Sequence, residues 1–288
     1  MIYRLTPQLH TKVWGWEKWL VSTHPAGETP VGETLVSAGT AVPAGTALSE
    51  VIGGRYPLLI KLIRAEDRLS VQVHPGDDYA REHEGDSGKT EFWYIVDADP
   101  GATLICGLNP HNGESPSRDG HPSRDALQKA IDEGTLEDWL HVADVKPGDA
   151  FFIPAGTVHA ICGGITLLEV QQSSDVTYRL YDWGRDREIH VQKSLDVINY
   201  DQQNDELHIR NFTGITNPYF TAEKVLLNGV ITEKAEADTS YVLISGSAEI
   251  SGSGLNEAFI VSEGEAFLVM NGSTVTIKGS AEFMRAKA

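Results

Sequence analysis

Short apolar runs separated by turn residues recur along the first half of the chain. Four of them lie close together: YPLLIKLIRA, LSVQVHP, EFWYIVDADPG and ATLICGL. Runs of this length, rich in Val, Ile, Leu and aromatic residues and bounded by Gly, Pro or Asp, are typical of β-strands. The polar segment between His74 and Glu91 predicts a loop with one helical turn. We therefore predict an all-β-dominated fold.

A helical island interrupts this strand pattern. In PSRDALQKAIDEG, Ser123 is suited to cap the start of a helix and Gly134 to end it, and Thr135 can cap a second short helix, LEDWL. The island, near residues 122–141, is too short to bury a core of its own, so we predict a small insertion between strands. HVQKSLDVIN predicts one more helix, the following NYDQQNDEL is polar enough for a linker, and strand patterns resume from about Phe220.

A weak internal repeat sets the expected architecture. The segment Lys146–Ile161, KPGDAFFIPAGTVHAI, aligns with Ser262–Ile277, SEGEAFLVMNGSTVTI, through matching Gly, Asp/Glu, Ala, Phe and Ile positions. Two copies of one hairpin-like unit predict two related β-barrels in one chain. His159 of the first copy meets Val275 of the second. Polar chemistry carried by this hairpin is therefore expected in the first barrel and not in the second.

Polar side chains interrupt the apolar strands of the first predicted barrel at three places. In SVQVHP, Gln72 and His74 are two residues apart and project from the same face of a strand, whereas the neighbouring valines face the other way. Glu91 directly precedes an aromatic strand, and His159 follows a Pro/Gly turn that directs the next strand. Together these positions offer two imidazoles, a carboxylate and an amide.

These four side chains are candidate metal ligands. Imidazole nitrogen combined with carboxylate oxygen suits Zn²⁺, and suits Fe²⁺ or Mn²⁺ less exclusively; a site without thiolates is of the open, catalytic kind. The residues alone leave other interpretations open, because a histidine in a strand is more often a hydrogen-bonded or rim residue. Glu91 can equally be a solvated strand end, and His159 can cap a turn.

Composition narrows the expected partners and compartment. The chain has 288 residues and a formal net charge of −18, which repels phosphate at long range and disfavours nucleic acid or an anionic membrane as partner. A small anionic substrate is compatible with this charge where basic residues converge. The two cysteines, Cys106 and Cys162, form no CxxC pattern, as suits a reducing compartment. Because neither a signal-peptide core nor an apolar run of about 18 residues is present, we expect a cytoplasmic protein.

Four motifs follow one another in a fixed order along the chain. They are LSVQVHPGDDYA with GKTEFWYIV, then IPAGTVHAI, then EVQQSSDVTYRLYDWGR, and finally HVQKSLDVI. In sequence and order they closely resemble the type I mannose-6-phosphate isomerases of the cupin superfamily, in their short bacterial form. The resemblance covers most of residues 10–200, whereas residues 210–288 carry little family-specific signal.

The resemblance, taken with the repeat, implies two cupin-like jelly-roll β-barrels. We expect a catalytic domain over residues 1–200, which contains the helical insertion near 122–141. A smaller cupin-like domain without metal ligands is expected over residues 201–288. The resemblance further implies one zinc ion per chain, held by the same four residues that their spacing selected: Gln72, His74, Glu91 and His159.

The resemblance also implies which side chains contact the substrate. Arg179 becomes an active-site arginine, and Ser70 and Lys89 line the substrate pocket, with Lys89 directed toward the phosphate. Arg179 is a permanent cation and a poor proton acceptor, so we interpret it as stabilising an enediolate or clamping the substrate. Without the resemblance, Arg179 can equally form a rim salt bridge with Asp182 or Asp175, and Lys89 can be a solvated strand-end lysine.

The implied activity is the interconversion of mannose 6-phosphate and fructose 6-phosphate, an aldose–ketose isomerisation through a cis-enediolate. The sequence does not assign the general base; a carboxylate and a metal-bound water are both candidates. One alternative is another cupin metalloenzyme, such as an Fe²⁺ oxygenase, or a different sugar-phosphate isomerase; the glutamine ligand argues against the oxygenase. A second alternative is a non-catalytic sugar-binding cupin, against which the retained ligands and Arg179 argue.

Overall fold

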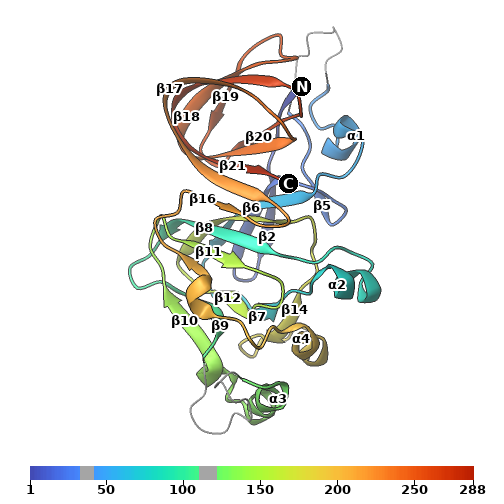
Figure 1. Ribbon diagram of the computed structural model, residues 1–288, viewed down its shortest axis with the longest axis vertical. Coiled ribbons are helices and arrows are strands. Elements are labelled where there is room, and N and C mark those ends of the chain that lie inside the picture. Colours follow the sequence, from blue (N-terminus) through green and yellow to red (C-terminus); the bar gives the residue numbers. More distant parts are fainter. Residues whose placement is uncertain (33–41, 110–121) are drawn as a thin grey trace.

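The protein is built from two β-rich units stacked along its long axis (Figure 1). The computed structural model describes residues 1–32, 42–109 and 122–288. Antiparallel strands dominate both units, and the helices are short and peripheral (Figure 1). The prediction of a strand-dominated fold is therefore confirmed. None of the helices in the described residues has the length and apolar character required to cross a membrane.

The first unit consists of two sheets that face each other across an apolar core. Side chains of both sheets, such as Ile63 and Trp93 on one and Leu104 and Ile161 on the other, share one buried cluster. The seven-stranded sheet has the order β15 (His208–Ile209), β11 (Ala150–Ile153), β8 (Glu91–Ala98), β13 (Ile165–Gln172), β6 (Leu58–Ala65), β3 (Gly15–Val21) and β2 (Gln8–Lys12). The five-stranded sheet has the order β10 (Leu140–Asp144), β9 (Thr103–Leu108), β12 (His159–Ile161), β7 (Val71–Val73) and β14 (Tyr178–Tyr181).

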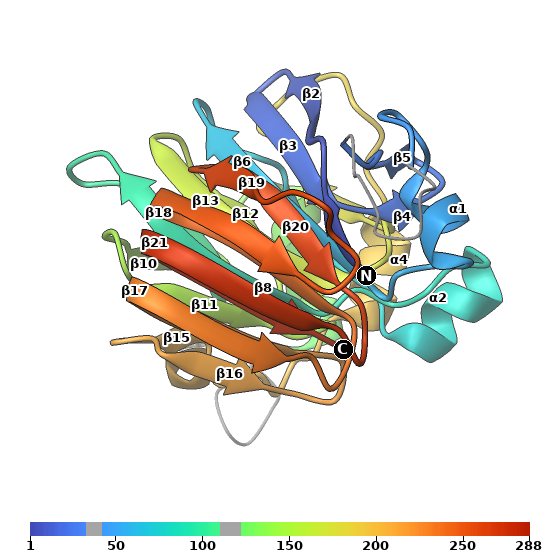
Figure 2. The same cartoon turned by 90° about the horizontal axis from the view of Figure 1, so that it is seen from above.

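The second unit is one strongly curved sheet whose longest strands lie side by side as a single layer (Figure 2). The path through it is β1 (Ile2–Arg4), β20 (Ala266–Val269), β18 (Thr239–Gly252), β21 (Thr274–Lys287), β17 (Thr221–Lys234) and β16 (Gly214–Thr216), with β19 (Phe259–Ser262) paired to β18. The N-terminal strand β1 thus belongs to a sheet otherwise formed by the last third of the chain. A small separate hairpin joins β4 (Thr23–His24) to β5 (Gly27–Glu28).

The predicted helical insertion lies between β9 and β10, at the end of the molecule remote from the second unit (Figure 1). Ser123 Oγ accepts a hydrogen bond from the backbone N–H of Ala126 at 3.2 Å, and Gly134 ends the helix with φ of +72°. Both boundary predictions are confirmed, and the second short helix is a 3₁₀ turn. The helical elements are α1 (Leu48–Ile52), α2 (Asp77–His83), α3 (Arg124–Glu133), η1 (Leu136–Trp139), α4 (Val191–Val197) and η2 (Asn204–Glu206).

The segment predicted as a polar linker is more structured than expected. It contains η2, and it continues into β15, which pairs with β11 of the first unit. The backbone N–H of Phe152 donates to the carbonyl of Leu207 at 2.8 Å. Its buried anchor is Leu207, the only aliphatic residue of the stretch NYDQQNDEL. One such residue gives no periodic signal, which is why the pattern alone predicted a linker.

The two hairpins of the internal repeat have the same local structure. Gly148 and Gly264 both adopt positive φ, at +91° and +72°, a conformation that glycine adopts without steric cost. The next residue in each copy, Asp149 or Glu265, accepts a hydrogen bond from the backbone N–H three residues earlier, at 3.1 and 2.8 Å. The repeat therefore reflects real structural equivalence, and two related β units are confirmed.

A continuous apolar cluster joins the two units. Phe92 of the first unit packs in the same buried cluster as Val242 and Met284 of the second. A buried hydrogen bond crosses the same boundary, from the Tyr56 hydroxyl to Ser240 Oγ at 3.1 Å. Each unit therefore covers apolar surface that the other would expose to water.

Candidate functional site

A row of side chains crosses the five-stranded sheet at one level. In the register of neighbouring strands, Cys106 on β9 is opposite His159 on β12, His159 is opposite Gln72 on β7, and Gln72 is opposite Arg179 on β14. Residues directly opposite each other in an antiparallel sheet project from the same face. The fold therefore brings Gln72, His159 and Arg179 together, although they are far apart in the sequence.

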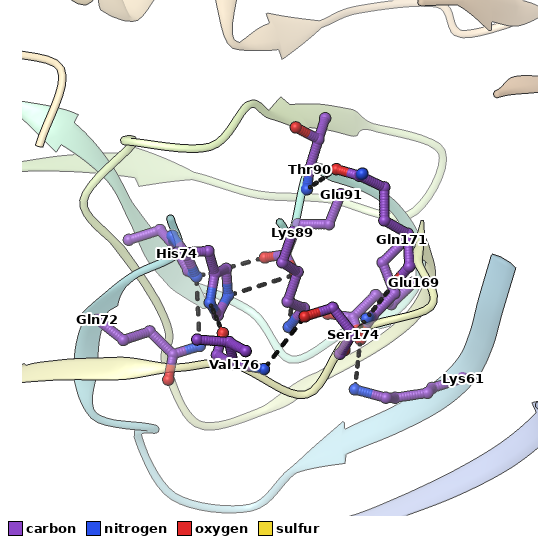
Figure 3. A network of polar contacts seen from close by, with 12 residues as sticks. Lys61, Gln72, His74, Lys89, Thr90, Glu91, Glu169, Gln171, Ser174 and Val176 are labelled. Carbon is purple, nitrogen blue, oxygen red and sulfur yellow. Dashed lines mark hydrogen bonds and ion pairs between the residues drawn. The ribbon is translucent and has the colours of Figure 1, made fainter. Parts of the chain in front are cut away.

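Three of the predicted ligands, His74, Glu91 and His159, form a compact buried cluster; His74 and Glu91 are labelled in Figure 3. His74, just after β7, and His159 approach Glu91, the first residue of β8 in the facing sheet. Glu91 Oε1 lies 3.3 Å from His159 Nε2, and Glu91 Oε2 lies 3.6 Å from His74 Nε2. One ligand atom from each residue lies within 4.8 Å of the other two. All three residues are 1% exposed, so the structure places the three side chains as a metal site requires.

Gln72 completes the edge of this cluster. Its Nε2 lies 3.2 Å from His159 Nε2, and its Oε1 accepts a hydrogen bond from Ser70 Oγ at 3.2 Å. The two ends of an amide are nearly isosteric, so a half-turn exchanges oxygen for nitrogen without moving the rest of the side chain. The amide oxygen can therefore face the cluster when a cation requires it.

Both histidines are held through Nδ1, which leaves Nε2 without a proton in each ring. Nδ1 of His74 donates to the carbonyl of Val176 at 2.8 Å, and Nδ1 of His159 donates to the carbonyl of Thr157 at 2.9 Å. These bonds fix the tautomer and leave each Nε2 as a lone-pair donor toward Glu91. Nε2 of His74 is buried and has no hydrogen-bond partner among the described residues. A buried nitrogen acceptor that lacks a hydrogen-bond donor is suited to bind a cation.

Burial sets the protonation states of the cluster. Desolvation lowers the pKa of His159 to about 4 and that of His74 well below its ordinary value, so both imidazoles stay neutral at pH 7. Burial also raises the pKa of Glu91 to about 8, although Lys89 acts in the opposite direction. A divalent cation at this point would favour the ionised Glu91 carboxylate. The residues present therefore fit a metal with nitrogen and oxygen ligands.

Lys89 and Ser70, the two predicted pocket residues, both touch predicted ligands. Lys89 Nζ lies 2.9 Å from Glu91 Oε2, and Lys89 is 4% exposed. The alternatives of a solvated strand-end lysine and a solvated strand-end glutamate at these positions are therefore wrong. Ser70 is buried and donates to Gln72.

A second buried ion pair beside the cluster was missed by the sequence analysis (Figure 3). Lys61 Nζ lies 2.9 Å from Glu169 Oε2, and both side chains are 4% exposed. Burial alone would raise the pKa of Glu169, but Lys61 and Lys89 outweigh it and lower that pKa to about 2. The sequence did contain a sign of this pair, because Lys61 interrupts the apolar run LLIKLI and Glu169 interrupts the run LLEVQQ. The strand register, which sets Glu169 opposite Lys61, was needed to pair them.

Arg179 lies on β14 opposite Gln72 of β7. Its Nη1 donates to the carbonyl of Glu188 at 3.5 Å. Asp182, one of the two carboxylates proposed from the sequence as a salt-bridge partner, instead accepts two hydrogen bonds of 2.6 Å from Arg187. The alternative of an Arg179–Asp182 salt bridge is therefore wrong.

Comparison with known proteins identifies the family of this chain. Residues 4–91 match the family model of the phosphomannose isomerase type I catalytic domain. A probable mannose-6-phosphate isomerase of Bacillus subtilis is 34% identical over 292 residues, which cover 93% of this chain and 88% of the relative. The chain belongs to the type I mannose-6-phosphate isomerase family. A mannose-6-phosphate isomerase of Streptococcus mutans is also 34% identical, over 84% of this chain and 83% of its own length.

Solved structures of mannose-6-phosphate isomerases share the fold along the whole chain. The enzyme of Bacillus subtilis superposes with a TM-score of 0.84 at 27% identity and covers 100% of this chain and 99% of its own. This match establishes the cupin-like arrangement of both units. A zinc-bound mannose 6-phosphate isomerase superposes with a TM-score of 0.70 at 15% identity, covering 99% of this chain and 98% of its own. At that identity the likeness concerns the fold, and the zinc is a property of that protein.

Proposed function

We propose that this protein is a zinc-dependent mannose-6-phosphate isomerase, which interconverts mannose 6-phosphate and fructose 6-phosphate. The observation that carries the proposal is the buried cluster of His74, Glu91 and His159, with both imidazole Nε2 atoms free of protons and directed at one carboxylate. Gln72 is proposed as the fourth ligand. Two imidazoles and a carboxylate without a thiolate are the ligand set of a catalytic zinc site, which binds one ion per chain.

The reaction requires ring opening and then proton transfer between C2 and C1 through a cis-enediolate. When bound, zinc would act as a Lewis acid and polarise a substrate oxygen. Arg179 lies on the same sheet face as Gln72 and His159, so its guanidinium can stabilise the negative charge of the enediolate. Because it cannot lose its proton, Arg179 is not the base.

Ser70 and Lys89 are proposed to line the substrate pocket. Lys89 Nζ lies 2.9 Å from Glu91 Oε2, so its charge acts beside the metal cluster. To contact the phosphate of a substrate, the Lys89 ammonium would have to break its contact with Glu91 Oε2. A protein of net charge −18 needs local cations to bind a sugar phosphate dianion, and Lys89 and Arg179 are the pair we assign.

We also propose that the first unit is catalytic and the second unit is structural. The catalytic domain is assigned to residues 1–200 with the helical insertion, and the smaller, structural domain to residues 201–288. Two short strands cross this boundary, because β1 belongs to the second sheet and β15 to the first. Val275, which occupies the repeat position of His159, is fully buried in an apolar cluster of the second unit. The substrate and metal residues assigned above all belong to the first unit.

A coupled assay tests the proposal directly. Mannose 6-phosphate is supplied and the formation of fructose 6-phosphate is followed for the wild type, Arg179→Gln and Arg64→Gln. We expect turnover by the wild type and a loss of about 10²-fold in kcat for Arg179→Gln, because a positioned charge is removed from the transition state. Arg64 forms a partly exposed pair with Asp99 at 3.6 Å, and its variant should retain wild-type rates.

Other outcomes of this assay have defined meanings. Absence of turnover in zinc-loaded wild-type protein would refute the proposed reaction and direct the search to other sugar phosphates. Oxygen uptake with Fe²⁺, and none with Zn²⁺, would favour the cupin oxygenase instead. Equal rates for Arg179→Gln and the wild type would remove Arg179 from the mechanism while leaving the metal site in place.

A further inference from the structure

Arg179 lies on a strand edge that the sheet does not cover. β14 is the last strand of the five-stranded sheet, and an edge strand has backbone donors and acceptors on its outer side that need other partners. The pairing of β14 with β7 is also irregular, because the register shifts between Arg179 and Tyr181. Sheet pairing on one side is therefore a weak constraint on the direction of the Arg179 side chain.

His190 supplies the missing partner on the outer side. The backbone N–H of Arg179 donates to His190 Nδ1 at 3.2 Å, and the backbone N–H of His190 donates to the carbonyl of Arg179 at 2.7 Å. One residue thus satisfies both outward backbone groups of Arg179, as a neighbouring strand would. The acceptor role of Nδ1 places the ring proton on Nε2, which lies 3.8 Å from Glu188 Oε2.

His190 is itself fixed from both sides along the chain. After it, its carbonyl accepts from the backbone N–H of Ser194 at 2.9 Å and so begins α4. Before it, Asp182 is 4% exposed and accepts two hydrogen bonds of 2.6 Å from Arg187. The loop between Asp182 and His190 is therefore closed by an ion pair, and its Glu188 carbonyl reaches Arg179 Nη1 at 3.5 Å.

We propose that His190 is a positioning residue, which holds the backbone of Arg179 so that its guanidinium is directed at the substrate. The proposal rests on the catalytic role assigned to Arg179 above. His190 bonds the backbone of Arg179 and lies 6.0 Å from the Tyr178 ring between centroids. We therefore expect its effect on kcat to pass through Arg179, and the experiment must separate this from a structural effect on β14 and α4. Loss of Nδ1 would leave the Arg179 N–H without its acceptor and free the edge of β14 at the residue where the register shifts.

The test is a double-mutant cycle on the metal-loaded protein. His190→Leu removes the acceptor, whereas His190→Asn retains an acceptor close to the position of Nδ1; each is made in the wild type and in Arg179→Gln. We expect His190→Leu to lower kcat about tenfold while KM changes less than about threefold, and His190→Asn to recover most of the loss. In the Arg179→Gln background, His190→Leu should change kcat less than about twofold.

His208→Leu is the matched control, because His208 has a similarly exposed side chain, 19% against 22% for His190. It lies on β15, and its variant should retain wild-type kcat. Equal losses for His190→Leu in both backgrounds would overturn the proposal, as would an Asn variant no better than the Leu variant when both melt like the wild type. If His190→Leu does not fold, His190→Asn against His190→Ala makes the same comparison, because alanine has no side-chain acceptor. Absence of turnover in the wild type would refute the proposed function instead, so the two failures are distinguishable.

Discussion

The buried pair of Lys61 and Glu169 allows a quantitative test of the interior of the first unit. The change is Lys61→Met, which keeps the length of the side chain and removes its charge. Glu169 then loses the ammonium 2.9 Å from Oε2 in a site where both side chains are 4% exposed. Leaving one buried charge of a pair without its partner costs about 3–5 kcal/mol of the free energy of unfolding.

The pH dependence of this loss follows from the same charges. In the wild type, Lys61 and Lys89 hold the pKa of Glu169 at about 2 against the effect of burial. Without Lys61 the effect of burial gains weight, so the pKa in the folded protein rises and the protonated carboxyl is favoured. A lowered pKa in the folded protein contributes stability that is present above the ordinary carboxyl pKa of about 4.5 and is lost as the pH falls toward 2. Lys61→Met removes this contribution, so the destabilisation should be larger at pH 7 than at pH 3.

Urea unfolding followed by tryptophan fluorescence measures the effect, in chelator so that metal binding adds nothing to the folded state. Arg64→Met, on the same strand but in a partly exposed pair with Asp99, should cost less than about 1 kcal/mol. The double variant Lys61→Met/Glu169→Gln should recover most of the loss, because no unpaired charge is left. A loss for Lys61→Met as small as that for Arg64→Met would refute the reasoning, since it would mean that Glu169 is solvated.

Two further predictions concern the second unit and metal uptake. Removal of residues 210–288 should produce a less stable and less soluble protein, because Phe92 and its neighbours lose the apolar partners that cover them; a soluble fragment with unchanged melting temperature and activity would contradict this. Metal affinity of the metal-free protein should rise about tenfold per pH unit from pH 5 to 8 and level off above that. The reason is that metal must displace the proton held by Glu91, whose pKa is about 8, while His159, at about 4, is already neutral. A titration that gives the same affinity at pH 6 and pH 8 would exclude this linkage.

The sequence predicted those parts of the site that depend on local pattern. Two-residue spacing in SVQVHP predicted that Gln72 and His74 share a face, and the repeat separated His159 from Val275. The buried pair of Lys61 and Glu169 was not predicted, because a charged residue inside an apolar run does not reveal which strand pairs with it. Pairing between remote strands is decided by the packing of whole sheets, and no short window of sequence contains it.

For the fold too, local features could be predicted from the sequence, whereas pairing between remote strands could not. Strand content, the cap at Ser123 and the stop at Gly134 follow from local chemistry and were predicted. The placement of β1 beside β20 joins residues at opposite ends of the chain. The pairing of β15 with β11 depends on Leu207, whose burial is apparent only in the assembled unit.

The most direct test of the central claim is the metal content of the purified protein, measured with the isomerase assay on the same sample. We predict about one zinc per chain, loss of turnover on chelation, and recovery when zinc is returned. His159→Ala should lose both metal and turnover while it keeps the fold. Full conversion of mannose 6-phosphate by protein stripped of metal, or by His159→Ala, would contradict the account.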